Sequence, residues 1–299
     1  MLKIPLSGWY TELKASANAP AKINLYLDVM QKRPDSFHDI KSIMHTVRLS
    51  DTVTVETKSG GGIQLFCSDP ELPTDSRNLA YRAAELFFER TGINGACEIH
   101  IEKNIPVAGG LAGGSTDAAA VLKLLNALCK EPLDQSALLR LGAEIGSDVP
   151  FCLSGGCALC TGRGEIMTPL PVLPETLCVI ANAGEGVSTP EAYKMLDDAF
   201  GEHLSDDLGD IDAAVSAVER GDMSSLYRSA FNIFEEKVLA VCPKARRIRD
   251  EFSECGAALS MMSGSGSTVF ALFESEDAAR RAVQAARAGG AFCVLTVTG

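Results

Sequence analysis

The stretch Pro106-Val107-Ala108-Gly109-Gly110-Leu111-Ala112-Gly113-Gly114-Ser115-Thr116-Asp117 holds four glycines within six residues. Apolar residues then recur at helical spacing from Ala118 to Cys129, which predicts an amphipathic helix. Glycines permit close approach and unusual backbone dihedrals, while the free N–H groups and the dipole at a helix start favour negative charge. The stretch therefore predicts a phosphate-binding loop that leads into a helix.

This loop differs from two common nucleotide-binding patterns. No Gly-Lys-Ser/Thr follows it, and its glycines do not match Gly-x-Gly-x-x-Gly. The alternative is a flexible connector whose Ser115 or Thr116 only caps the helix. Four glycines exceed what a simple cap requires, so the pattern favours phosphate binding.

Length and composition narrow the class of protein. A chain of 299 residues with 46% hydrophobic and 22% charged residues is typical of a globular protein of two domains, or one large one, rather than a disordered chain. The formal net charge of −12 argues against general nucleic-acid binding. A few Lys and Arg side chains can still hold a small anionic ligand locally.

Location and redox state follow from two features. The segment Met1–Lys14 lacks the apolar core of a signal peptide, and no later stretch approaches 18 uninterrupted apolar residues, so we expect a cytoplasmic protein that does not span a membrane. The ten cysteines are then expected to be reduced and to act as small hydrophobic residues.

We expect no protein-bound metal centre. Cys157 and Cys160 form a Cys-x-x-Cys pair with no second such pair, and their odd spacing on a strand sends the thiols to opposite faces. The histidines lack metal-ligand spacing; they are His38, His45, His100 and His203.

Hydrophobic periodicity predicts an α+β protein. Residues 22–29 alternate as a half-buried strand, with Lys22, Asn24, Tyr26 and Asp28 on the polar face. Further strands are expected at 51–56, 63–66, 97–102, 157–161, 176–182, 258–262, 268–273 and 292–298. Helices are expected at 78–90, 115–129, 134–144, 191–200, 212–219, 224–238, 244–255 and 277–287. The Pro-rich stretch 168–174 is the best candidate linker between two domains.

Three segments in the same order resemble the motifs of the GHMP kinases, small-molecule kinases that bind ATP without a Walker A motif. They are the glycine-rich loop, Ala-Pro-Ala-Lys-Ile-Asn-Leu at 19–25, and Met-Ser-Gly-Ser-Gly-Ser-Thr-Val-Phe at 262–270. The resemblance implies the two-domain α+β GHMP kinase fold, with the active-site cleft between the domains. We expect an N-terminal ATP-binding domain at 1–168 and a C-terminal domain at 169–299.

Within the family, the segments 33–38, 146–151 and 162–165 resemble members that phosphorylate the 2-hydroxyl of 4-diphosphocytidyl-2-C-methyl-D-erythritol in non-mevalonate isoprenoid biosynthesis. Ser36 and Phe37 stand where Gly and Tyr are commoner, and Ala112 where Gly is commoner. The alternatives are a homoserine or mevalonate type of kinase, disfavoured by Phe37-His38 and the doubled Gly113-Gly114, and a non-catalytic nucleotide-binding protein, disfavoured by Lys22 and Asp148.

The resemblance also assigns catalytic residues. Lys22 and Asn24 project from the same strand face, where the alternative is a solvated surface, and the family pattern makes Lys22 catalytic and Asn24 substrate-binding. It makes Asp148, in a turn whose Pro150 favours an extended Val149, the group that accepts the hydroxyl proton. Lys22 is expected beside Asp148, favouring its ionised form and stabilising charge on the transferring group.

The remaining assignments concern ligands. Phe37 and His38, expected to be exposed at a loop tip, would stack on and hydrogen-bond the pyrimidine. Mg²⁺ is expected with ATP, and Ser115 and Thr116 would reach the phosphates or this ion. As partners we expect a small-molecule substrate, no nucleic acid and no membrane, in a monomer or homodimer. The expected ATP-binding residues are Lys103, Pro106, Val107, Ala108, Gly109, Gly110, Leu111, Ala112, Gly113, Gly114, Ser115 and Thr116.

Overall fold

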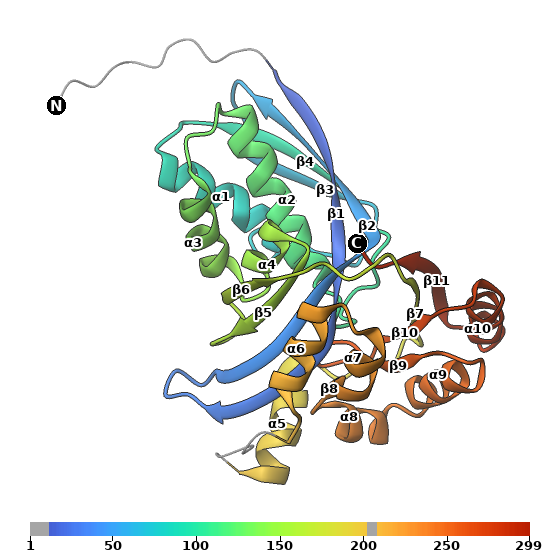
Figure 1. Ribbon diagram of the computed structural model, residues 1–299. Coiled ribbons are helices and arrows are strands. Elements are labelled where there is room, and N and C mark those ends of the chain that lie inside the picture. Colours follow the sequence, from blue (N-terminus) through green and yellow to red (C-terminus); the bar gives the residue numbers. More distant parts are fainter. Residues whose placement is uncertain (1–11, 202–207) are drawn as a thin grey trace. The chain divides into compact units, whose positions relative to one another are not determined.

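The computed structural model describes residues 12–201 and 208–299 (Figure 1), so His203 and the first eleven residues of the Met1–Lys14 segment lie outside the described residues. The strands are β1 (Lys14–Lys32), β2 (His38–Lys58), β3 (Ile63–Cys67), β4 (Ala96–Glu102), β5 (Cys157–Thr161), β6 (Ile166–Leu170), β7 (Leu177–Asn182), β8 (Phe231–Asn232), β9 (Leu259–Met262), β10 (Val269–Phe273) and β11 (Phe292–Val297). The helices are α1 (Leu79–Thr91), α2 (Gly113–Leu128), α3 (Gln135–Ile145), α4 (Val149–Ser154), α5 (Thr189–Phe200), α6 (Ile211–Arg220), α7 (Met223–Ser229), α8 (Glu235–Val241), α9 (Pro243–Glu254) and α10 (Glu276–Ala288). Mixed helices and strands confirm the α+β prediction.

The chain divides into two compact units, each made of several segments. Unit 1 comprises the residues up to Ala19 together with Asp51–Asn104 and Gly114–Leu153. Unit 2 comprises Pro20–Ser50, Ile105–Gly113 and Ser154–Gly299. The long strands β1 and β2 therefore contribute one part to each unit.

In unit 1, β4 pairs in parallel with β3 and antiparallel with the last residues of β2. Helix α1 packs against β3, β4 and α3, and α1, α2 and α3 gather beside these strands in Figure 1. The sequence fixes α1 locally, because the Asn78 side chain caps its first turn and Gly92 ends it with φ of 67°. Its buried face is apolar and consists of Ala80, Ala83, Ala84 and Phe87.

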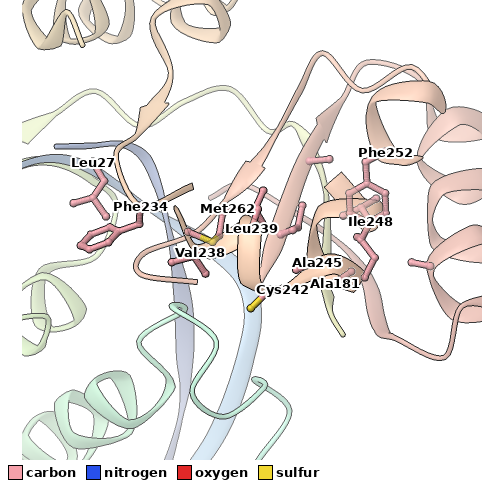
Figure 2. Packing of buried hydrophobic residues seen from close by; sticks show 14 of the residues in the cluster. Leu27, Ala181, Phe234, Val238, Leu239, Cys242, Ala245, Ile248, Phe252 and Met262 are labelled. Atoms are coloured by element: carbon pink, nitrogen blue, oxygen red, sulfur yellow. The ribbon is translucent and has the colours of Figure 1, made fainter. Parts of the chain in front are cut away.

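Unit 2 contains an antiparallel sheet in the order β11-β7-β10-β9. Helices α9 and α10 pack on it, and its core extends to Leu27 of β1 and Phe234. Figure 2 shows Val238, Leu239 and Cys242 between Phe234 and the α9 residues Ala245 and Ile248. Elsewhere in this unit β1 pairs with β8, β2 with β5, and β5 with β6.

Strand β1 is buried on both faces, so the prediction of a half-buried strand at 22–29 is wrong. The expected polar face is as inaccessible as the apolar one: Lys22 is 4% exposed, Asn24 1%, and Tyr26 and Asp28 0%. Alternation correctly predicted a strand. It could not tell solvent from an internal hydrogen-bond network, which is what surrounds Lys22 and Asn24.

Two other sequence predictions differ from the structure. The helix expected at 224–238 is interrupted by β8, because Phe231 and Asn232 pair in parallel with β1 and tertiary pairing overrides local propensity. The expected linker at 168–174 starts within β6, where Pro169 lies opposite Ala158 of β5. A proline fits there because, among the strands that the structure describes, β6 pairs with β5 alone and is therefore an edge strand.

Candidate active site

Lys22 and Asn24 form a buried polar pair on β1. The Lys22 ammonium donates to Asn24 Oδ1 at 2.6 Å and to the backbone carbonyl of Gly110 at 2.9 Å. The backbone N–H of Lys22 also donates to the carbonyl of Leu111 at 3.2 Å. The alternative of a solvated strand face is therefore excluded, and β1 fixes the glycine-rich loop through both backbone and side chain.

The same loop packs closely on the C-terminal glycine-rich segment. The Gly110 carbonyl accepts a second hydrogen bond from Ser263 Oγ at 3.0 Å. A Cβ on Gly110 would lie 2.1 Å from the Ser263 carbonyl, and one on Gly109 would lie 2.3 Å from Thr268 Oγ1. Only glycine allows this approach, so unit 2 brings together parts of all three segments that carry the family resemblance.

The loop is anchored at Leu111 and open at Val107. Leu111 is 1% exposed and belongs to a core cluster of unit 2, whereas Val107 is 48% exposed. Ala108 and Ala112 adopt positive φ values of 53° and 60°, conformations that cost a non-glycine residue about 1–2 kcal/mol. The positive φ of Ala112 agrees with the expectation that glycine is commoner at this position.

In unit 1, helix α2 presents one of its two expected hydroxyl groups. Thr116 is 1% exposed and is buried with the helix, whereas Ser115 is partly exposed. A Cβ built on Gly146 would lie 4.0 Å from Ser115 Oγ. Ser115 thus lies beside the turn that leads to Asp148, and it suits a ligand contact better than Thr116.

Asp148 occupies the expected turn, but the backbone after it is helical. The Asp148 carbonyl accepts from the N–H of Cys152 at 3.0 Å as α4 begins at Val149. The prediction of an extended Val149 is therefore wrong, because Pro150 lies in the first helical turn, where its missing N–H costs nothing. The Asp148 side chain is half-buried, so the turn holds it without removing it from solvent.

Lys103 is neither solvated nor isolated. Its side chain is 7% exposed, and its ammonium lies between Asp51 and Asp117, 2.8 Å from Asp117 Oδ2. Burial raises the pKa of the Asp117 carboxyl to about 7, while the charge of Lys103 opposes that rise. The two carboxylates engage this cation directly, and its contact with a nucleotide stays a prediction.

Sequence reasoning did not assign a role to Asp51 or Asp117. Asp117 directly follows the glycine-rich loop, and its position as the fifth residue of α2 was the available signal. Asp51 lies in the middle of β2, where nothing local indicates a buried carboxylate. Their pairing with Lys103 depends on tertiary structure.

Phe37 is exposed at the expected loop tip. Half of its surface is accessible, at 50%, and the Arg163 guanidinium lies 4.9 Å from the centre of its ring, a cation–π distance. Ser36 precedes it with φ of 67°, at a position where the family resemblance leads us to expect glycine more often. The Phe37 ring therefore offers an aromatic face beside a positive charge.

His38 is buried, which corrects the expectation that it is exposed with Phe37. Only 7% of it is accessible, because Tyr193 and Asp197 of α5 cover its ring. Its Nε2 lies 2.8 Å from Asp197 Oδ1, its ring stacks on Tyr193 at 4.6 Å, and Lys32 Nζ holds the other Asp197 oxygen at 2.5 Å. Burial alone would raise the pKa of Asp197, but hydrogen bonds from Lys32 and His38 lower it. His38 is thus held by α5, which the sequence did not indicate.

Comparison with known proteins identifies the family. Residues 78–156 match the model of the GHMP kinases N terminal domain, and residues 214–291 match that of the GHMP kinases C terminal domain. A 4-diphosphocytidyl-2-C-methyl-D-erythritol kinase of Geobacillus thermodenitrificans is 45% identical over 270 residues, covering 90% of this chain and 91% of that protein. A protein of the same name from Nostoc punctiforme is 44% identical over 284 residues, covering 90% of each.

Solved structures agree with these matches. A crystal structure of 4-(cytidine 5'-diphospho)-2C-methyl-D-erythritol kinase superposes with a TM-score of 0.79 at 35% identity, covering 95% of this chain and 99% of that one. Homoserine kinase from Cytophaga hutchinsonii gives a TM-score of 0.75 at 22% identity, covering 100% and 97%, a likeness of fold alone. The predicted GHMP kinase fold is confirmed. Within residues 12–201 and 208–299, no helix has the length and apolarity needed to span a membrane.

Proposed function

The chain belongs to the GHMP kinase family, and from this premise we propose that it transfers the γ-phosphoryl group of ATP to the 2-hydroxyl of 4-diphosphocytidyl-2-C-methyl-D-erythritol. The observation that carries this function is the identity of 42–45% over about nine tenths of the chain with several kinases named for that substrate. The product is the 2-phosphate, a precursor in non-mevalonate isoprenoid biosynthesis.

The two alternative functions have weaker support. Similarity to homoserine kinase is limited to 22% identity, which concerns the fold and not the acceptor. A non-catalytic nucleotide-binding protein would not need a buried lysine at its phosphate-binding loop. Here the Lys22 ammonium is hydrogen-bonded to the carbonyl of Gly110 in the glycine-rich loop. Asp148 is present as well, so both residues proposed for catalysis are retained.

Phosphoryl transfer depends mainly on positioning and on stabilising the charge of the transferring group. We assign ATP binding to residues 106–116, because Val107 and Ala108 are exposed and the loop leads into the start of α2 at Gly113, where helix N–H groups and the helix dipole favour phosphate. Lys22 is fixed by two oxygen acceptors and would stabilise charge that develops on the γ-phosphoryl group. Asp148 would accept the proton of the attacking hydroxyl, for which its half-buried turn leaves it accessible.

Mg²⁺ would accompany ATP and neutralise phosphate charge. The residues fit such an ion, because Ser115 offers a partly exposed hydroxyl at the start of α2. Among residues 12–201 and 208–299 no group of three or more His, Cys, Asp or Glu could hold a metal alone. Mg²⁺ usually keeps water and phosphate oxygens as most of its ligands, so one protein hydroxyl is compatible with this chemistry.

Recognition of the cytidine is assigned to Phe37 and His38. The half-exposed Phe37 ring offers a stacking surface for a planar base. His38 Nε2 is hydrogen-bonded to Asp197. This contact fixes the orientation of the imidazole ring and therefore also the direction in which its other nitrogen, Nδ1, points. Asn24 is assigned a substrate contact through its amide, although that group is 1% exposed.

Three broader proposals accompany the function. All ten cysteines are free thiols, a state typical of a reducing compartment, and we place the reaction in the cytoplasm. We retain the division at residue 168, which falls between the segments that match the two domain models. We also propose that the protein is a monomer or a homodimer.

An acceptor panel tests the function. The chain is incubated with MgATP and, separately, 4-diphosphocytidyl-2-C-methyl-D-erythritol, homoserine, mevalonate or no acceptor, with ADP release measured and products identified by mass spectrometry. We expect phosphorylation of the cytidine-bearing acceptor alone. Transfer to homoserine or mevalonate instead would reassign the substrate, and ATP binding without transfer to any acceptor would favour the non-catalytic alternative.

A further inference from the structure

A buried serine on β2 is hydrogen-bonded to the Lys22–Asn24 pair. Asn24 Nδ2 donates to Ser42 Oγ at 2.8 Å, and Ser42 Oγ donates to the backbone carbonyl of Tyr26 at 2.7 Å. Ser42 is 0% exposed and lies opposite Cys160 of β5. It is therefore enclosed in the sheet and cannot contact a ligand itself.

The direction of these hydrogen bonds is fixed by chemistry. A backbone carbonyl only accepts hydrogen bonds, so the single Ser42 proton goes to Tyr26. The Ser42 oxygen must then accept, and the only donor on the Asn24 amide is its nitrogen. This places Asn24 Oδ1 at the other end of the amide, where it accepts from the Lys22 ammonium at 2.6 Å.

We propose that Ser42 is a positioning residue for phosphoryl transfer, because it holds the NH₂ end of the Asn24 amide and thereby keeps Asn24 Oδ1 in place for the Lys22 ammonium. The inference rests on the proposed function of Lys22. The ammonium only donates, so it still selects Oδ1 when the Ser42 hydroxyl is removed. The NH₂ end of the amide then has lost its Ser42 acceptor, and the amide can tilt away from the position in which Oδ1 lies 2.6 Å from the ammonium.

Kinetics of three single variants and one double variant test this role, with the melting temperature measured for each. In Ser42→Ala we expect kcat to fall about tenfold or more, with KM for ATP within about twofold, since the contact with Lys22 matters most when charge develops in the transition state. Ser42→Thr keeps the hydroxyl and should recover kcat to within about threefold. Asn24→Ala removes the amide through which Ser42 acts, so the double variant Ser42→Ala/Asn24→Ala should have the same kcat as Asn24→Ala.

A readout besides activity separates this inference from the proposed function. In protein labelled with ¹⁵N-asparagine, the Asn24 side-chain amide resonance, identified by its loss in Asn24→Ala, should exchange hydrogen at least about tenfold faster in Ser42→Ala than in wild type or Ser42→Thr. Unchanged exchange, or kcat losses that multiply in the double variant, would overturn the role of Ser42. Failure of the wild type in the acceptor panel would overturn the function alone, because the exchange measurement does not depend on turnover.

Discussion

Replacing Lys103 by methionine removes the cation from a buried site with two carboxylates. The side chains of Asp51, Asp117 and Lys103 are 0%, 4% and 7% exposed, so water cannot replace the lost ammonium. Removing one partner of a buried ion pair costs about 3–5 kcal/mol, and here two acidic groups lose the same partner. We expect Lys103→Met to lower the melting temperature by about 10 °C at pH 7.5.

The loss of stability in Lys103→Met should depend on pH. The pKa of Asp117 is raised to about 7 in the folded protein, above its usual value, and removal of the lysine charge raises it further. A raised carboxyl pKa means that the folded state binds more protons than the unfolded state, so stability falls as pH rises towards the folded pKa. Between pH 7.5 and pH 5.5, Lys103→Met should therefore recover part of the lost stability.

Differential scanning calorimetry at the two pH values measures both effects. Lys58→Met is the matched control, because Lys58 pairs with Glu56 and Glu98 on the surface of the same unit and should not change the melting temperature measurably. Adding Asp117→Asn to Lys103→Met should restore part of the lost stability, since it removes one of the two carboxylates that lost the lysine. A wild-type melting temperature in Lys103→Met, or a loss that is the same at both pH values, would refute the reasoning.

Two further predictions concern base recognition and acid stability. Phe37→Ala should raise KM for the cytidine-bearing acceptor about tenfold without changing KM for ATP, whereas Phe66→Ala, a control at a similar exposure of 49%, should change neither; an unchanged acceptor KM in Phe37→Ala would remove the stacking assignment. His45 is buried, with Nδ1 bonded to the Thr46 carbonyl and Nε2 accepting from the N–H of Leu173, and burial lowers its pKa below 6.5. The neutral form is thus stabilised, and this contribution is present above pH 6.5 and lost as pH falls towards the folded pKa. Urea midpoints between pH 7.5 and 5 should fall less steeply in His45→Gln than in wild type, and equal slopes would contradict a neutral buried imidazole.

Much of the fold could be predicted from local sequence signals. The helix at 78–90, capped by Asn78 and ended by Gly92, needed only short-range information. The glycine-rich loop predicted close approach of a phosphate, whereas its packing on Ser263 and Thr268 is known only from the structure. The interruption of the expected 224–238 helix was not predictable in this way. It arises because Phe231 and Asn232 pair with β1, a strand some 200 residues earlier in the sequence.

The site residues also divide into those with a local sequence signal and those placed only by tertiary structure. Alternation placed Lys22 and Asn24 on one strand face, and the family resemblance assigned their roles. Their burial was missed, since alternation does not distinguish solvent from a hydrogen-bonded interior. Ser42, Asp51 and Asp197 carry no local signal, because each acts through a partner distant in the sequence. His38 was misjudged for the same reason: its contact with Asp197 comes from α5.

Phosphoryl transfer by Asp148→Asn, compared with the wild type, tests the central claim most directly. Asparagine keeps the size and hydrogen-bonding capacity of the side chain but cannot accept the hydroxyl proton. Wild type should convert 4-diphosphocytidyl-2-C-methyl-D-erythritol to its phosphate with release of ADP, while Asp148→Asn, with unchanged ATP affinity and melting temperature, should lose about 100-fold or more of kcat. Near-normal turnover by the folded variant would contradict the assignment of Asp148 as the base. Absence of product with the wild type would contradict the proposed kinase activity.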